Sequence, residues 1–413
     1  MTDGTKAPDK VRAVQVINVQ GVEFSNPVPG IHVASQPISG CAWIETDEGI
    51  VLIDTMLSRK AAAMVLEKIR ETGKKIEYII YTHHHLDHIG GCQVFMEDNP
   101  KAVIANEYLP GNMDRYKRLA AHRGRIAAQQ FNLPEVPTTG EGWVYPTETF
   151  SGEKTITLGG KTFELRTARA ETDDVCWVWV PEMKAAFVGD VMIGSFPNIG
   201  NPWKPTRFTY DWVKTLEAVR AKEPEHIFYS GAGKLRSGEV AREALDHNIE
   251  AIHSLHDQVV DYINQNVHIS EMIHMVKLPD HLKDSPYLQS YYSRPEFFVY
   301  NAYRWYHGYF DHNPAHLLPR PEKEVCGALF EVIGDEKKIL DKAKALLADD
   351  QAQLGLQVLD VLIQAEPENI EARKLHIELL EELGSADYCL MSRNSWVYFI
   401  DKDKEFLKSK GAM

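Results

Sequence analysis

Apolar residues in the first half of the chain fall in short runs that predict β-strands, with turns and a few helices between them. The runs 40–44 and 49–54 flank the turn residues Asp47 and Glu48 and predict a hairpin. The continuous run of strand-forming residues 76–81 predicts a buried strand, and apolar residues at helical spacing predict a helix over 58–71. Further strands are expected at 101–105, 162–165, 175–179, 185–188 and 226–229. Strands interleaved with helices in this way favour a layered α/β sandwich.

The pattern becomes helical after Gly238. Residues 239–264 place apolar side chains three to four positions apart, without glycine or proline, which predicts one long amphipathic helix. From residue 335 the chain is rich in Ala, Leu, Glu and Lys and predicts helices over 339–348, 353–364 and 369–383. We therefore expect an α/β domain over residues 1–238 and a helical domain over residues 239–413.

A strongly aromatic stretch lies within the helical part. Residues 287–310 contain 11 Tyr, Phe and Trp residues in 24 positions. Such a density implies a large buried surface, which is either a core or a subunit interface. A ligand-lining role for some of these rings is the alternative.

Composition and charge exclude several classes of protein. With 413 residues, 44% hydrophobic and 25% charged, the chain is typical of a globular protein of two or three domains. Its net charge of −14 argues against binding to nucleic acid or to an anionic membrane surface. No apolar run approaches the roughly 20 residues of a membrane span. An anionic substrate would need a local cationic feature, such as a metal ion or a buried arginine.

The cysteines and the N-terminal residues indicate in which cellular compartment the protein is expected. The five cysteines are odd in number, widely spaced and form no CxxC pair, which argues against a disulfide framework or a thiolate metal site. Residues 1–9 are polar and lack the apolar segment of a signal peptide. We therefore expect a cytoplasmic protein.

The densest group of chemically active residues is Thr-His-His-His-Leu-Asp-His-Ile-Gly-Gly over residues 82–91, directly after the predicted buried strand. In an extended backbone the side chains of His83 and His85 lie on the same face, so the pair can coordinate one metal ion. Asp87 and His88 follow in the turning loop and can reach a second ion nearby. Imidazole and carboxylate ligands without a thiolate suit one or two Zn²⁺ ions, or Fe or Mn.

The H-x-H-x-D-H spacing, read here as His83, His85, Asp87 and His88, resembles the signature of the metallo-β-lactamase superfamily. The resemblance implies an αββα sandwich with a one- or two-metal site on its edge. It also implies that further ligands follow two later strands and a Gly-His-Gly turn.

The resemblance assigns two later carboxylates as ligands. Glu171 takes a position where histidine is usual, and a carboxylate there is a feature of the alkyl sulfatase branch. Asp190, at the end of the run 187–190, matches the bridging aspartate. The implied arrangement has a first ion on His83, His85 and Glu171, a bridging Asp190, and Asp87 with His88 holding the second ion or acting as base. Asp87, His88 and Asp190 are thus the expected catalytic residues.

The last expected ligand is missing. The segment 228–233 has the strand and the glycines, but Ala232 stands where the superfamily has a metal histidine. Three explanations are open: a natural variant with a weakened or single-metal site, a site completed by another residue or by substrate, or a substitution introduced to disable the enzyme. His226 and Tyr229 lie on the same strand and either compensate for the loss or serve the fold.

Residues 296–317 and 390–394 are similar to the dimerisation domain of alkyl sulfatases, so the resemblance covers most of the chain and implies a homodimer. In longer alkyl sulfatases a lipid-carrier-like domain follows. The present sequence ends soon after residue 394, which predicts a substrate shorter than a detergent.

The implied activity is metal-dependent hydrolysis of a small anionic ester, first an alkyl sulfate monoester. Arg207 is the candidate for binding the anion, because its planar fork can hold two oxygens and its place before Trp212 resembles that of a sulfate-binding arginine. The expected substrate contacts are Arg207, Phe196, Asn198 and Trp203. Relatives in the superfamily hydrolyse lactones, thioesters or phosphodiesters, or use iron for redox chemistry, and these are alternatives. A dimeric scaffold with an impaired metal site is a further alternative, motivated by Ala232.

Overall fold

The structure, a computed structural model, describes residues 11–14 and 21–413 of the chain. By their contacts these residues form two compact units. The sandwich unit comprises residues 21–124 and 136–308, and the helical unit comprises residues 11–14, 125–135 and 309–413. Helices between residues 238 and 306 share a core with a β-sheet of the sandwich unit. The domain boundary after residue 238 stays a prediction.

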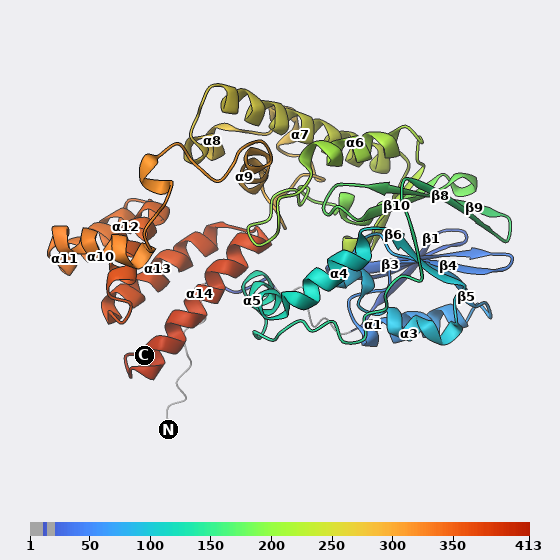
Figure 1. Ribbon diagram of the computed structural model, residues 1–413, viewed down its shortest axis with the longest axis horizontal. Coiled ribbons are helices and arrows are strands. Elements are labelled where there is room, and N and C mark those ends of the chain that lie inside the picture. The colour runs from blue at the N-terminus through green and yellow to red at the C-terminus, as the bar shows by residue number, and fades with distance from the viewer. Residues whose placement is uncertain (1–10, 15–20) are drawn as a thin grey trace. The chain divides into compact units, whose positions relative to one another are not determined.

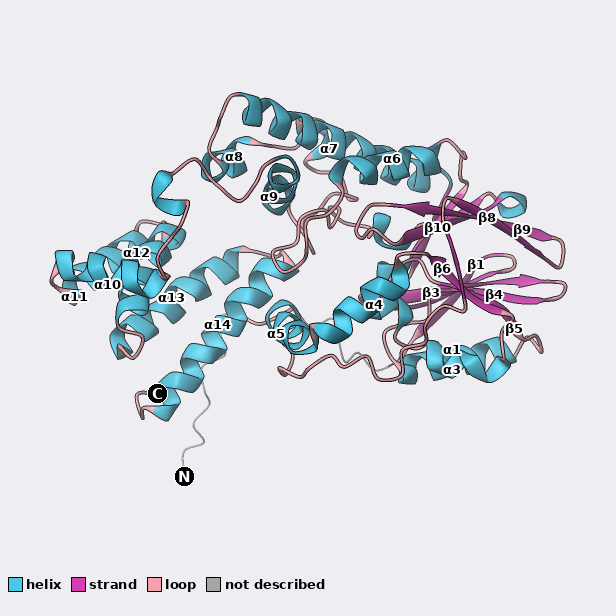
Figure 2. Ribbon diagram, in the orientation of Figure 1, coloured by secondary structure: helices cyan, strands magenta, loops and turns pink. Residues whose placement is uncertain are grey.

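The strands of the sandwich unit, magenta in Figure 2, form two sheets, and the first sheet joins antiparallel strands to parallel ones. Its strands, in spatial order, are β1 (Glu23–Val28), β2 (Ile31–Gln36), β3 (Ser39–Thr46), β4 (Gly49–Ile53), β5 (Ile76–Ile80), β6 (Ala102–Asn106) and β7 (Glu148–Phe150). The strands β1 to β4 pair antiparallel, and β4 to β7 pair parallel. The predicted hairpin is β3 and β4, and the predicted buried strand is β5.

The second sheet packs face to face against the first. Its spatial order is β13 (Lys234–Ser237), β12 (His226–Tyr229), β11 (Ala185–Phe187), β10 (Val175–Val180), β9 (Lys161–Ala168) and β8 (Glu153–Leu158). Only β11 and β12 pair parallel among these described strands. Apolar side chains such as Ile44 from one sheet and Val178 and Phe187 from the other fill the space between the sheets.

Helices cover the two outer faces, which confirms the predicted αββα sandwich (Figure 1). The first sheet is covered by α1 (Arg59–Arg70) and α3 (Cys92–Phe95), and the second by α6 (Thr209–Arg220), α7 (Gly238–Asn264) and α9 (Pro295–Tyr306). The N-cap of α1 is Ser58, whose side chain accepts a hydrogen bond from the Ala61 amide. Further helices are α2 (Leu86–Ile89), α4 (Leu109–Arg118), α5 (Ala120–Phe131) and α8 (Ile269–Met275).

The helical unit contains α10 (Glu322–Ile333), α11 (Glu336–Ala348), α12 (Ala352–Ala365), α13 (Ile370–Ala386) and α14 (Leu390–Ser409). The three predicted helices correspond to α11, α12 and α13, whereas α10 and α14 were not expected. The aromatic stretch divides between environments: Phe298 and Tyr303 are buried in the sandwich unit, while Tyr309 is 85% exposed. Among the described helices, none combines the length and the apolar character needed to cross a membrane.

Candidate metal centre

The His-rich motif lies where two neighbouring parallel strands end. Ile53 at the end of β4 pairs with Ile80 at the end of β5, so the residues that follow these strands meet at one edge of the sheet. The motif then turns into α2, and its two glycines bring the chain close to the backbone of Leu57 and Thr55. A Cβ on Gly91 would lie 2.1 Å from the Thr55 carbonyl oxygen, so a glycine is required there.

The first group of potential ligands brings together three side chains predicted from the sequence. The Nε2 of His83 lies 2.9 Å from the Nδ1 of His85. The Oε2 of Glu171 is 3.2 Å from that His83 nitrogen and 3.3 Å from that His85 nitrogen. Glu171 comes from the turn between β9 and β10, so the group links the two sheets at their common edge.

The second group contains His83, His88 and Asp190, with one ligand atom of each within 4.8 Å of the others. The Nε2 of His88 is 3.4 Å from the Oδ1 of Asp190 and 3.2 Å from the Oδ2 of Asp87. Asp190 lies in the turn after β11. The backbone of Gly231 passes directly beside it, since a Cβ there would meet the Oδ1 of Asp190 at 2.3 Å. The turn that contains Ala232 therefore borders this group.

The unsatisfied polar atoms of the two groups fit a bound cation. Three buried atoms face these groups without a hydrogen-bond partner in the described part of the chain: the Nε2 of His88, the Oε2 of Glu171 and the Oδ1 of Asp190. A buried polar atom without a partner costs about 1–3 kcal/mol. A divalent cation would satisfy all three, and imidazole with carboxylate is a donor set for Zn²⁺, Fe or Mn.

The charge states also suit metal binding. Burial raises the pKa of Glu171, but the Arg207 guanidinium and then His85 outweigh burial and hold that pKa well below its ordinary value. Burial lowers the pKa of His85 well below its ordinary value, so its imidazole is neutral. For His88, burial lowers the pKa, but the carboxylates of Asp190, Asp87 and Asp54 together raise it well above its ordinary value. A bound cation would take the place of that proton.

Asp54 supports the second group and was missed by the sequence analysis. This fully buried carboxylate accepts hydrogen bonds from the Thr82 amide, the Thr82 hydroxyl and the Nδ1 of His88, each at 2.8 Å. With its Nδ1–H committed to Asp54, His88 directs its Nε2 toward Asp87 and Asp190, and the lone pair of that atom becomes available to a cation once its proton leaves. Only its place directly after β4, a strand that pairs with β5, could have pointed to this role.

The four predicted substrate contacts occupy different environments. Arg207 is 2% exposed and its Nη1 donates to the Oε1 of Glu171 and to the carbonyl of Asn198. The Nδ2 of Asn198 donates to the same Glu171 oxygen at 3.0 Å. Phe196 is fully buried in the core beside Phe298. Trp203 is half-buried in the loop before α6.

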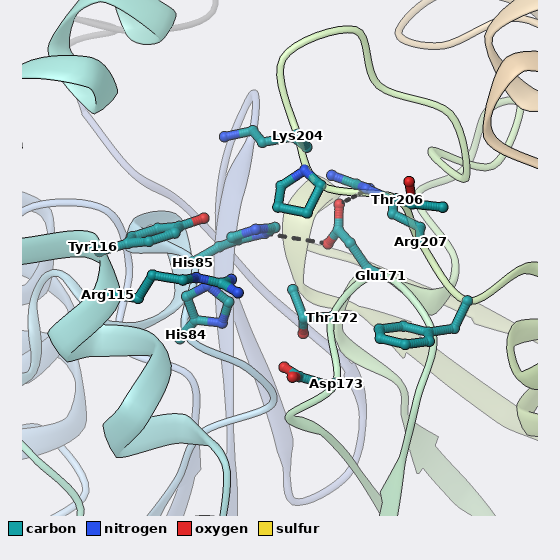
Figure 3. A pocket seen from close by; sticks show the side chains of 12 residues that line it. His84, His85, Arg115, Tyr116, Glu171, Thr172, Asp173, Lys204, Thr206 and Arg207 are labelled. Atoms are coloured by element: carbon teal, nitrogen blue, oxygen red, sulfur yellow. Dashed lines mark hydrogen bonds and ion pairs between the residues drawn. The ribbon is translucent and has the colours of Figure 1, made fainter. Parts of the chain in front are cut away.

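A cavity that is open to solvent lies beside the first group, and its empty space together with its open mouth is about 400 Å³ (Figure 3). Of the predicted site residues, its described lining includes His85, Glu171 and Arg207 but not Phe196, Asn198 or Trp203. The full lining is His84, His85, Arg115, Tyr116, Glu171, Thr172, Asp173, Lys204, Pro205, Thr206, Arg207 and Phe208. His84 occupies the position at which the motif specifies no residue. Its buried Nδ1 lies 2.9 Å from the Oδ1 of Asp174.

Comparison with known families gives two matches in this chain. Residues 38–231 match the family described as the metallo-beta-lactamase superfamily. Residues 268–404 match the family described as alkyl sulfatase dimerisation. Together the two matches take in strands β3 to β12, the His-rich motif and most of the helices that follow α7.

Individual relatives are similar over most of this chain. A linear primary-alkylsulfatase of a Pseudomonas species is 26% identical over 377 residues, which cover 85% of this chain and 71% of the relative. An (R)-specific secondary-alkylsulfatase of a Pseudomonas species is 23% identical over an alignment that covers 95% of this chain and 64% of that relative. The solved structure of the stereoselective inverting sec-alkylsulfatase Pisa1 from Pseudomonas has a TM-score of 0.82 at 22% identity, over 93% of this chain and 65% of that one. The chain thus spans less than two thirds of the length of the last two proteins.

Proposed function

We propose that this chain, which matches the metallo-beta-lactamase superfamily over residues 38–231 and the alkyl sulfatase dimerisation family over residues 268–404, is a metal-dependent hydrolase of a small sulfate monoester. One observation carries the proposal. Two groups of imidazole and carboxylate ligands share His83, and the first of them opens into a cavity that Arg207 also lines.

The residues fit one or two Zn²⁺ ions. His83, His85 and Glu171 would hold one, and His88 with Asp190 and Asp87 would hold the other. Bound there, such ions lower the pKa of water and polarise an ester oxygen. The identity of the metal as zinc is part of the proposal.

The protein's own side chains orient these ligands and receive the anion. Arg207 and Asn198 both donate to the Oε1 of Glu171, which leaves Oε2 directed at the histidines. Arg207 also lines the cavity, where its positive charge favours the sulfate head. Asp87 is 24% exposed and Asp190 is 11% exposed, so Asp87 is the better placed of the two to exchange a proton with solvent.

A homodimer is also proposed. Apolar side chains on one side of α10 are exposed: Val325 by 40%, Leu329 by 48% and Val332 by 87%. Their spacing of three and four residues forms a stripe that a second copy of the chain would cover. The match to a dimerisation family supports this assignment. Five buried free cysteines support the proposed cytoplasmic, reducing location.

Release of sulfate from butyl sulfate by the zinc-loaded protein tests the function. We expect turnover that a chelator abolishes and that His85→Ala reduces at least 100-fold, by analogy with removal of a catalytic group. As a matched control, His226→Ala should retain activity, because His226 lies outside both groups and pairs with Ser237. A well-folded, zinc-loaded protein that releases no sulfate would contradict the proposal, and lactone, thioester and phosphodiester substrates would then be assayed.

Metal analysis addresses the alternatives and the missing histidine. Two Zn²⁺ per chain would support hydrolysis, bound iron with a visible absorption band would support redox chemistry, and a folded chain without affinity for metal would support a scaffold. Ala232→His should raise the affinity for the second ion, because that turn borders Asp190. If this variant gains neither metal nor activity, the sulfatase assignment fails.

A further inference from the structure

Three cationic side chains beside the metal centre lack an anionic partner. Arg115 from α4 and Lys204 from the loop before α6 line the cavity, and the guanidinium of Arg123 stacks on the ring of Tyr116 at 3.8 Å. In the described part of the chain, none of these three charged groups forms a hydrogen bond or an ion pair. Figure 3 shows Arg115 and Tyr116 reaching in from α4 while Lys204 extends over the cavity. We call Arg115, Arg123 and Lys204 the cation cluster.

The nearby acidic groups are already engaged. Glu171 accepts from Arg207 and Asn198, and Asp173 accepts from the Asn112 amide at 2.7 Å. Burial raises the pKa of Tyr116 to about 12, so its phenol is neutral and supplies no countercharge. Burial and then the charges of Arg123 and Arg207 lower the pKa of Lys204 well below its ordinary value, while Glu171 and Asp87 act against them, so a bound anion would favour the charged form of Lys204. The cation cluster is therefore left without an ion pair among the described residues, and an anion in the cavity would supply one.

The cavity is a poor match for a long alkyl chain. An apolar wall stabilises each buried CH₂ group by about 0.8 kcal/mol. Here the wall includes Arg115, Lys204 and Asp173, whose hydration an alkyl chain would remove without replacing it. The sulfate head does not need these cations, since Arg207 and the proposed metal ions receive it.

We propose that the substrate carries a second oxyanion, a carboxylate or a chemically similar group, on its organic part, and that Arg115 and Lys204 bind it. The inference rests on the proposed function and deepens it. The substrate class is then a short ester with a sulfate at one end and another anion at the other. Arg115 supplies a planar fork for two oxygens and Lys204 a point charge, so together they select the anionic end by charge-assisted hydrogen bonds.

The test compares two substrates of equal length, butyl sulfate and the same chain ending in a carboxylate, with zinc-loaded protein. We expect kcat/KM to favour the carboxylate-bearing ester by at least about tenfold, the effect of one charge-assisted hydrogen bond. Arg115→Leu and Lys204→Met should each remove most of that preference through KM, while turnover of butyl sulfate changes less than about threefold. Arg115→Lys should restore part of it.

Matched controls separate a local charge effect from a general one. Arg118→Leu removes an exposed arginine from the same helix without touching the cavity lining, and it should leave the preference intact. Equal turnover of the two esters, or a preference for butyl sulfate, would overturn the inference while the proposed function stands. If neither ester is hydrolysed, the proposed function fails first. If Arg115→Leu does not fold, Lys204→Met still decides the question.

Discussion

Replacing Asp54 with asparagine would keep the shape of a fully buried side chain and turn one of its acceptor oxygens into a donor. The Oδ1 could still accept from the Thr82 amide, but an amide nitrogen would face the Nδ1 of His88 at the site of a 2.8 Å hydrogen bond. The Nδ1 of His88 would then have to accept a hydrogen bond from the amide nitrogen, which leaves the ring proton on Nε2. That atom is the one directed at Asp87 and Asp190, so the ring would lose its ligand lone pair.

The expected magnitudes follow from this change of tautomer. Loss of a group that orients a metal histidine costs about 10- to 100-fold in metal affinity. The weakened buried hydrogen bond should also lower the free energy of unfolding by about 1–3 kcal/mol. Competition between the Asp54→Asn variant and a chromophoric chelator would measure the affinity for Zn²⁺. Urea unfolding of the metal-free variant would measure the free energy of unfolding.

Asp174→Asn is the matched control for Asp54→Asn. Asp174 is equally buried and pairs with a histidine, His84, that belongs to neither ligand group. This control should lose comparable stability and keep its affinity for Zn²⁺. If Asp54→Asn binds zinc within about twofold of the wild type, or if both variants lose the same affinity, the assignment of Asp54 as the residue that orients His88 is refuted.

Three further results are expected. Arg207→Met leaves the buried Glu171 carboxylate without its cation and should lower the free energy of unfolding of the metal-free protein in urea by about 3–5 kcal/mol. Arg207→Lys should restore part of this loss, and an unchanged free energy of unfolding in Arg207→Met would contradict the reasoning. Because the pKa of His88 is raised, Zn²⁺ must displace a proton from its imidazole. The affinity for Zn²⁺ should therefore rise with pH, and calorimetry in two buffers should show that binding releases a proton. Binding without proton release would contradict this prediction. Val332→Glu should convert a dimer into a monomer of 46.9 kDa by light scattering, whereas Lys323→Glu on the opposite side of α10 should not.

The layered fold could be predicted because each layer leaves a local pattern in the sequence. The strand-forming run at residues 76–81 belongs to a parallel strand in which Ile76, Ile79 and Ile80 are buried, and α1 has the apolar spacing and the Ser58 cap of an amphipathic helix. The helix α14 was missed because tertiary packing, more than local periodicity, buries its side chains: Asp403, 2% exposed, is held by Arg373 and His376 of α13.

The metal ligands could be predicted in part, and the residues around them could not. His83, His85, Asp87 and His88 are close in the sequence, and Glu171 and Asp190 follow recognisable strands. Asp54 becomes visible as a partner of His88 only when β4 is paired with β5. Arg115 and Lys204 come from a helix and a loop that are far apart in the sequence, so nothing in the sequence indicates that they share a cavity.

Arg207 connects the sequence-based expectation with the observed packing. It was expected to receive the substrate anion, and it lines the cavity, yet its Nη1 also donates to Glu171. These two roles follow from one cause. A carboxylate in place of a neutral histidine ligand adds a buried negative charge, which is tolerated only when a cation lies against it. Because Glu171 already engages one edge of this guanidinium, a substrate with two anionic ends needs further cations, and Arg115 and Lys204 lie in the same cavity.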